Sequence, residues 1–260
     1  NESNLSDVNV TLYDEANVSQ GTIATDINGT YHFTDLIPGK YHIEVALVDN
    51  HGQTYVVSPM SVTTANDIND SDINASGVAR EEVLISAEHN MNYDAGLYIP
   101  VSIGDYAWSD ADGDGIQDAS ESPIKDVNVT LYRVEDNGTI TDIGSKDTNI
   151  SGGYLFDNLV PGKYFVEMIH PEHFRPTKQD VGADTNDSDI NITGFTDIFT
   201  LASPDDNLSI DGGYYELAEI NGTVTEDTDN DDLGDTPIKD VNITLYDENS
   251  KEVASTLTLI

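Results

Sequence analysis

The sequence predicts an all-β protein made of tandem β-sandwich domains. Three observations predict this class: a heptapeptide that returns at the spacing of one sandwich, runs of alternating apolar and polar residues, and Gly, Pro, Asn and Asp breakers between those runs. No stretch combines a 3.6-residue apolar period with helix caps, so we expect little helix.

The repeat is the strongest of these observations. The heptapeptide Asp7 to Tyr13 (DVNVTLY) returns unchanged at Asp126 to Tyr132 and with one substitution at Asp240 to Tyr246. Equivalent landmarks lie from 114 residues apart (Asp126 to Asp240) to 123 residues apart (Pro38 to Pro161), which is the size of one sandwich. We therefore predict three domains: 1–99, which lacks the beginning of the repeat; 100–216, a complete repeat; and 217–260, the N-terminal part of a third.

Seven strands are expected in the complete repeat, because each run alternates apolar and polar residues between breakers. They are Val101 to Trp108, Asp126 to Arg133, Thr139 to Lys146, Gly153 to Phe156, Lys163 to Ile169, Thr196 to Leu201 and Ile210 to Tyr215. The inward side chains would be Val127, Val129 and Leu131, then Tyr154 and Phe156, then Tyr164, Val166 and Met168.

The chain is strongly acidic. Forty-nine Asp and Glu residues against ten Lys and Arg give a formal net charge of −39, which excludes nucleic acids and anionic membrane surfaces as partners. Regular alternation and thirteen Tyr residues favour a packed core over disorder. The chain has no Cys, and the sequence shows no signal peptide, initiating Met or membrane-spanning run. We expect a part of a longer precursor that does not itself insert into a membrane.

Residues 110–121 carry the strongest candidate site, a twelve-residue calcium loop. Carboxylates stand at positions 1, 3, 5, 9 and 12, glycine at the sharp turn of position 6, and a backbone carbonyl ligand at position 7. These residues are Asp110, Asp112, Asp114, Asp118 and Glu121, with Gly115 and Ile116. Without a cation the clustered carboxylates would repel one another. The alternative is a solvated Asp-rich turn. The flanks read as strands, so no helix pair that opens a groove is expected.

Two further acidic clusters are weaker candidates. The third copy keeps carboxylates at Asp227, Asp229, Asp231 and Asp235, but it has Asp232 in place of the turn glycine and lacks the final Glu. A second type of cluster recurs at Asp67 to Asp72 and at Asp184 to Asp189, each followed by an Asp at the last strand (Asp94, Asp211). The second type is either a further ion site or a polar Asx-type loop.

Asn-X-Ser/Thr sequons point to an extracellular location. There are fifteen, at Asn1, Asn4, Asn9, Asn17, Asn28, Asn69, Asn74, Asn128, Asn137, Asn149, Asn186, Asn191, Asn207, Asn221 and Asn242. In the heptapeptide the two-residue period puts the Asn on the polar face of its strand in every copy. We therefore predict N-glycans on Asn9, Asn128 and Asn242. The alternative is an accidental match on a polar strand face.

The order of motifs resembles a known family. Gly104 to Trp108, the acidic loop, the heptapeptide, Gly153 to Phe156, Leu159 to Tyr164, Asn186 to Asp189 and Asp211 to Tyr215 together are similar to the SdrD B-like repeat of the Cna-B superfamily, over essentially the whole chain. The resemblance implies an immunoglobulin-like or prealbumin-like seven-strand sandwich, rigidified by Ca²⁺, in a stalk at the cell surface. It also implies that Asp110, Asp112, Asp114, Ile116 (through its carbonyl), Asp118 and Glu121 bind one Ca²⁺.

A function must make sense when it is repeated, which favours a structural module over an enzyme. The first hypothesis is a calcium-stabilised segment of an extracellular stalk, sheath or filament, whose partners are neighbouring repeats or copies of itself. Two alternatives remain open: an adhesive module that binds through its loops, and an accessory region of a secreted enzyme. Because both terminal repeats are incomplete, we expect either a longer array or head-to-tail strand addition between copies.

Overall fold

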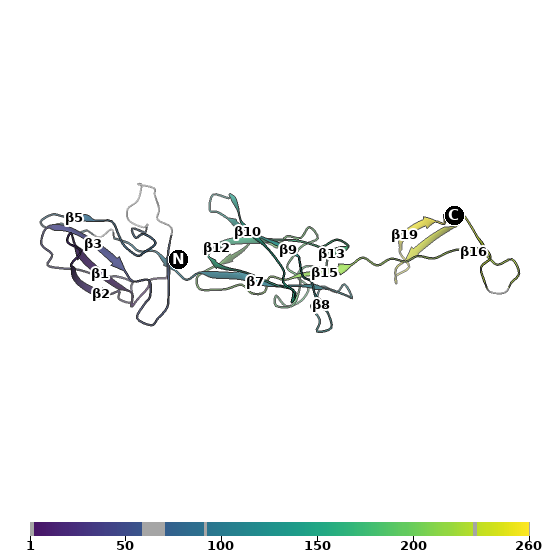
Figure 1. Ribbon diagram of the computed structural model, residues 1–260, viewed down its shortest axis with the longest axis horizontal. Coiled ribbons are helices and arrows are strands. Elements are labelled where there is room, and N and C mark those ends of the chain that lie inside the picture. Colours follow the sequence, from purple (N-terminus) through teal and green to yellow (C-terminus); the bar gives the residue numbers. More distant parts are fainter. Residues whose placement is uncertain (1–2, 59–70, 91–92, 231–232, 260) are drawn as a thin grey trace. The chain divides into compact units, whose positions relative to one another are not determined.

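Strands are the only regular elements of the described structure. The computed structural model describes residues 3–58, 71–90, 93–230 and 233–259, and Figure 1 shows their arrangement within each part. Those residues form no helix, and so none long and apolar enough to span a membrane. By internal contacts the chain divides into two units, Asn1–Glu216 and Leu217–Ile260. The all-β prediction is confirmed.

The middle of the first unit, residues 100–216, is a sandwich of two sheets (Figure 1). One sheet has the order β10-β9-β12-β14, formed by Ile140–Asp147, Asn128–Val134, Gly162–Ile169 and Phe199–Leu201. The other has the order β11-β7-β15-β13, formed by Gly153–Leu159, Val101–Ser109, Gly212–Glu216 and Phe174–Pro176. The short strand β8 (Ser122–Pro123) also pairs with β7. All pairs are antiparallel except β7 with β15, which is parallel.

Each of the seven predicted strands is found, with ends that shift by a few residues. The prediction missed β8 and β13, which have two and three residues and are too short to show a period. All eight predicted inward side chains are buried, as the alternation requires: Val127, Val129, Leu131, Tyr154, Phe156, Tyr164, Val166 and Met168. The single Trp of the chain, Trp108, is fully buried in the same repeat.

The described residues before residue 100 include a sheet of order β2-β1-β3-β5, built from Ser19–Ala24, Asn9–Asp14, Gly39–Val45 and Glu82–Leu84. A separate pair joins β4 (Val56–Val57) to β6 (Leu97–Tyr98). Val8, Val10, Leu12, Tyr41, Ile43 and Val45 form most of this core. These side chains correspond to those of β9 and β12, so the same pattern builds the same sheet.

The described residues of the second unit form two antiparallel strand pairs. β16 (Thr225–Glu226) pairs with β17 (Thr236–Pro237), as β7 pairs with β8 in the complete repeat. β18 (Asn242–Tyr246) pairs with β19 (Glu252–Leu257), as β9 pairs with β10. The apolar side chains of β18 stay exposed, because among the described residues of this unit no second sheet covers them.

In every copy a threonine hydroxyl forms hydrogen bonds to the backbone at and before the start of the heptapeptide. The hydroxyl of Thr148 donates to the Ile124 carbonyl (2.7 Å) and accepts the Val127 amide (3.0 Å). Thr25 and Thr258 make the same pair of bonds in their own copies. The Asp that opens each heptapeptide has a positive φ of 60° to 62°, a conformation that Asp tolerates better than most residues. These local devices explain why the hairpin recurs.

Candidate metal centres

Asp110 anchors the acidic loop to the sandwich. It follows β7 directly, and its amide donates to the Tyr214 carbonyl of β15 (2.7 Å). Its side chain is 1% exposed. One carboxylate oxygen accepts the Gly113 amide (2.6 Å), and the other accepts the Gly115 amide (2.9 Å) and the Thr177 hydroxyl. Asp110 therefore positions the loop through its own hydrogen bonds.

Gly115 makes the sharp turn that the loop requires. Its φ is +91°, and a Cβ at this position would lie 2.8 Å from the Lys178 carbonyl oxygen and 2.7 Å from the Val181 side chain. Both the backbone conformation and the lack of space exclude a side chain here. This agrees with the glycine expected at position 6 of the loop.

Three carboxylates come together at the start of the loop. Asp110, Asp112 and Asp114 each offer an oxygen that lies within 4.8 Å of the other two. Asp112 and Asp114 are exposed, and each accepts the amide two residues ahead, from Asp114 at 3.3 Å and from Ile116 at 2.8 Å. Grouped hard oxygens of this kind suit Ca²⁺, which takes six to eight oxygen ligands. The donor set fits that ion.

The other predicted ligands of this loop lie elsewhere in the same turn. Glu121 accepts the Ala111 amide (2.7 Å) and the Asp118 amide (3.0 Å), so its carboxylate closes the loop on itself. Neither Asp118 nor Glu121 belongs to the group of three carboxylates. Ile116 forms a bridge with Asp187, which ties the acidic loop to the second acidic cluster. Sequence reasoning had no signal for that contact.

The third copy brings a similar group together. Asp227, Asp229 and Asp235 offer oxygens that lie within 4.8 Å of one another, and all three are exposed. Asp235 accepts the hydroxyl and the amide of Thr228, and these bonds lower the pKa of its carboxyl. The remaining predicted ligand, Asp231, and the neighbouring Asp232 lie outside the described residues.

The second acidic cluster contains a buried pair of carboxyl groups. Asp211 is 1% exposed and Asp189 is 8% exposed, and the Asp211 amide donates to Asp189 (2.5 Å). Among the described residues, neither carboxylate oxygen of Asp211 has a hydrogen-bond partner of ordinary geometry, although the Tyr106 amide lies near enough to lower its pKa slightly. In repeat one the Asp94 amide donates to Asp72 (2.9 Å) in the same way; residues 67–70 lie outside the described part.

Burial dominates the titration of this pair. It raises the pKa of Asp211 from 3.8 to about 8, with the negative charges of Asp105 and Asp189 adding to the shift. Burial also raises the pKa of Asp189 to about 7, against the opposing hydrogen bond from Asp211. Removing a carboxylate from water favours its neutral form. Burial therefore favours the protonated form of both carboxyl groups in the absence of a cation.

The sequons of the heptapeptide lie on the polar strand face. Asn9 and Asn128 are half-buried, and each carboxamide nitrogen donates to a neighbouring side chain, Asn50 and Asp147 respectively, at 2.9 Å. Asn242 is exposed. A glycan on the first two would have to replace these hydrogen bonds.

The fold and the acidic loops define a class of protein: tandem all-β modules with a carboxylate-rich loop after the first strand. Residues 1–97 and 101–214 match the SdrD B-like domain family. The chain belongs to this family.

Its relatives include large repeat proteins of staphylococci. It is 36% identical over 266 residues to serine-aspartate repeat-containing protein F of Staphylococcus epidermidis, covering 99% of this chain and 16% of the relative. It is 38% identical over 217 residues to serine-aspartate repeat-containing protein D of Staphylococcus aureus (strain Newman), covering 83% of this chain and 15% of the relative. The chain thus spans about one sixth of the length of these relatives. Its place is extracellular, at the cell surface.

Solved structures similar to this chain include pilins. One is GBS52, the minor pilin of Streptococcus agalactiae, with a TM-score of 0.31 and 13% identity, covering 85% of this chain and 88% of that one. Another is BcpA, the major pilin subunit of Bacillus cereus, with a TM-score of 0.29 and 10% identity, covering 84% of this chain and 97% of that one. These likenesses are too distant to assign a role.

Proposed function

We propose that this chain is a calcium-stabilised structural segment of a cell-surface protein, acting as part of a stalk, sheath or filament. Its repeats would be 1–99, 100–216 and 217–260, and its partners would be neighbouring repeats or copies of itself. One observation carries the proposal: the loop with the three grouped carboxylates is attached to the strand by which the chain leaves the complete repeat. Asp110 bonds to Tyr214, two residues before Glu216, where the first unit ends.

The mechanism is mechanical. Residues 110–121 would hold one Ca²⁺, with the grouped carboxylates of Asp110, Asp112 and Asp114 as the first ligands. The Ile116 carbonyl and the carboxylates of Asp118 and Glu121 would complete the site. The ion would supply positive charge that removes the repulsion within the loop. A stiffened loop beside the exit strand limits bending at the base of the next repeat. Repetition along the array then gives a rod in which each module contacts mainly its neighbours.

The loop of the third copy, with Asp227, Asp229, Asp231 and Asp235, would bind Ca²⁺ more weakly, because it lacks the final Glu and the turn glycine. The Asp189 and Asp211 pair is a candidate for a second ion in the complete repeat. The observation that favours it is the buried Asp211 carboxylate, whose oxygens have no partner of ordinary geometry among the described residues. Glycans on Asn9, Asn128 and Asn242 would cover the polar face of the heptapeptide strand, one in each repeat.

Calorimetry tests the central claim. Titration of the chelator-treated chain with CaCl₂ should show binding with a dissociation constant of about 10⁻⁴ to 10⁻³ M, as in other extracellular calcium modules. Asp112→Asn should weaken it, whereas Asp157→Asn on the exposed side of β11 should not. Small-angle scattering should then show a longer maximum dimension with Ca²⁺ than with EDTA. An absence of calcium-dependent heat, or unchanged scattering despite binding, would refute the calcium site or the stiffening role respectively.

A further inference from the structure

The outward face of the sheet β10-β9-β12-β14 carries a group of aromatic and apolar side chains. Tyr132 of β9 lies opposite Phe165 of β12, and their rings stack with centroids 4.9 Å apart and an interplanar angle of 13°. Phe165 also contacts Phe195, whose ring centroid lies 6.2 Å away. Ile198, just before β14, is 60% exposed. We call these four side chains the aromatic patch.

Strand alternation places the aromatic patch on the outside of the sandwich. The side chains that alternate with it along the strands, Leu131, Val166 and Phe199, pack in the core. The patch members next to them therefore point outward. Phe195 lies outside the named strands, and its ring contact with Phe165 fixes it on the same face. The four side chains thus form one continuous surface.

The aromatic patch is particular to the complete repeat. In repeat one the positions of Tyr132, Phe165, Phe195 and Ile198 are held by Tyr13, His42, Val78 and Glu81. Tyr13 still stacks on His42, with ring centroids 5.3 Å apart. An imidazole, a smaller aliphatic side chain and a carboxylate make this face more polar, so the fold does not require the patch. A solvent-facing apolar group of this kind marks an interaction surface.

Two carboxylates border Tyr132. Its hydroxyl donates to Glu167 (2.9 Å), and Asp142 of β10 lies opposite it in the register. The hydrogen bond to Glu167 raises the pKa of Tyr132, and burial and the charges of both carboxylates add to the shift. Because Phe165 covers the ring from the β12 side, the other ring face is turned toward β10 and Asp142. A cation there would meet a π-face and two carboxylates.

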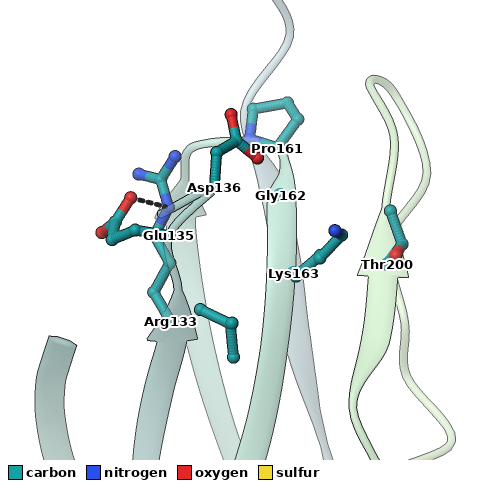
Figure 2. A pocket seen from close by; sticks show the side chains of 8 residues that line it. Arg133, Glu135, Asp136, Pro161, Gly162, Lys163 and Thr200 are labelled. Atoms are coloured by element: carbon teal, nitrogen blue, oxygen red, sulfur yellow. Dashed lines mark ion pairs between the residues drawn. The ribbon is translucent and has the colours of Figure 1, made fainter. Parts of the chain in front are cut away.

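The outward face ends in a cation at the start of β12. Lys163 stands in register with Thr200 of β14, and Figure 2 shows it pointing toward that residue. Arg133, which follows Tyr132 along β9, belongs to the opposite face, where its ion pair with Glu135 is visible in Figure 2. The outward face is therefore basic at this end and acidic around Tyr132, which would orient a charged partner.

Charge complementarity selects the partner. A chain of net charge −39 attracts cationic molecules and repels polyanions. A hydrated inorganic cation would gain nothing from the apolar rings, and a neutral sugar would leave the two carboxylates without a countercharge. A polypeptide segment with both apolar and basic side chains satisfies both parts of the surface, as the anchor residues of protein interfaces do.

We propose that the aromatic patch docks a basic, apolar segment of a partner protein. The apolar side chains of that segment lie against Phe165, Phe195 and Ile198. One Lys or Arg lies over the free ring face of Tyr132, beside Asp142. The chain would then hold a second protein at the cell surface in addition to its structural role, and this docking does not depend on the calcium loop.

Amide chemical shifts of the full ¹⁵N-labelled chain test this proposal. The probe is the synthetic peptide acetyl-LKLRLKL-amide, which alternates Leu with Lys or Arg, in millimolar Ca²⁺ at physiological ionic strength. Asn128 lies on the same face at the other end of β9, so the chain is produced without glycans. We expect saturable shifts at the amides of Tyr132 and Phe165, and none at those of Tyr13 and His42.

Three further ligands separate the parts of the recognised chemistry. A peptide with Ser in place of every Leu keeps the charge and should bind at least fivefold more weakly, because the rings lose their apolar contacts. A peptide with Glu in place of every Lys and Arg should not bind. Cellopentaose, a neutral sugar that can stack on aromatic rings, should not shift the patch amides.

Two variants introduce the residues of repeat one. Phe165→His should weaken binding about fivefold, and Asp142→Ser about threefold through the lost charge. The matched changes Leu155→His and Asp157→Ser, on the exposed side of β11, should leave binding unchanged. Trp108 fluorescence confirms that each variant is folded. The proposal is overturned if the probe gives no saturable shift at the patch, if any of the three further ligands matches it, or if either patch variant binds as the unaltered chain does.

Discussion

The same hairpin occurs in two surroundings in this chain, one covered and one open. In the complete repeat Val129 and Leu131 are 0% exposed, whereas their counterparts Ile243 and Leu245 in the second unit are 42% and 41% exposed. Both hairpins nevertheless pair antiparallel, and both carry a β-bulge at the Leu-Tyr step of the heptapeptide. The first repeat has its bulge at the same step. Local sequence is therefore sufficient for the hairpin, but burial depends on a second sheet.

The two acidic loops also differ in how they pack against the rest of the chain. Each brings oxygens of three carboxylates within 4.8 Å of one another. Each connects two strands that pair over only two residues. The loop of the complete repeat is held from behind by a buried Asp110, by Thr177 and by Asp187, whereas all three grouped residues of the third loop are exposed. Packing against the sandwich should make the first loop the better ordered site, because less conformational entropy remains to be lost on binding.

The largest expected loss of stability comes from shortening a buried side chain of the heptapeptide hairpin. Leu131→Ala should lower the free energy of unfolding of the complete repeat by about 2–5 kcal/mol, because it opens a cavity in a closed core. The matched change Leu245→Ala should cost less than about 1 kcal/mol, since that side chain is already partly in water. Urea denaturation followed by Trp108 fluorescence reports the first, and hydrogen exchange of the β18 amides reports the second. Equal costs would mean that something covers β18 in solution.

Calcium removal should have the next largest effect. Ca²⁺ at 100 times its dissociation constant should add about 2.7 kcal/mol to the stability of the complete repeat, so EDTA should lower the temperature of the Trp108 transition. Asp112→Asn should remove most of this difference, and Asp229→Asn in the third loop should not change it. A transition that is identical in EDTA and in Ca²⁺ would contradict the proposal.

The buried pair predicts an unusual pH dependence in chelator. Because the pKa of Asp189 is raised to about 7 and that of Asp211 to about 8, the folded repeat keeps protons that the unfolded chain releases near pH 4. The stabilisation that the protonated pair gives the folded repeat is complete below about pH 4 and is lost as the pH rises toward 8. The urea concentration at the midpoint of unfolding, followed by Trp108 fluorescence, should therefore decrease as the pH is raised from 5 to 8.

Asp211→Asn keeps the shape of the side chain and should flatten that profile, whereas the exposed change Asp157→Asn should not. Repeating the series in Ca²⁺ sharpens the test, because a cation bound at the pair would displace the protons and reverse the slope. A flat profile for the unaltered chain in chelator would show that the pair is not protonated at neutral pH.

Glycosylation has the smallest expected effect on stability. Peptide mapping of native material should find glycosylated forms of the peptides that contain Asn9, Asn128 and Asn242, with the highest occupancy at Asn242. Its exposure makes it more accessible than Asn9 and Asn128, whose nitrogens are already hydrogen-bonded. Finding all three peptides only in their unmodified form would refute this prediction.

Sequence reasoning predicted much of the fold and part of the candidate site. Alternation identified Val127, Val129 and Leu131 as inward residues, because a strand turns every second side chain to the same face. Ligand spacing predicted a calcium site in the loop of Asp110 to Glu121, of which the structure groups Asp110, Asp112 and Asp114. Neither signal could reveal that Glu121 bonds to the amides of Ala111 and Asp118, since those bonds depend on the detailed course of the turn.

What the sequence by itself determined is the local structure: strand faces, breaker positions, the repeat and its recurring hairpin. These depend on residues a few positions apart, whose sterics and hydrogen bonds act in any surroundings. The tertiary structure alone decided which hairpin is buried and that Asp211 lies in a place where its carboxylate is costly to ionise. Those properties arise from segments that are distant in the chain, and only the packing of two sheets brings them together.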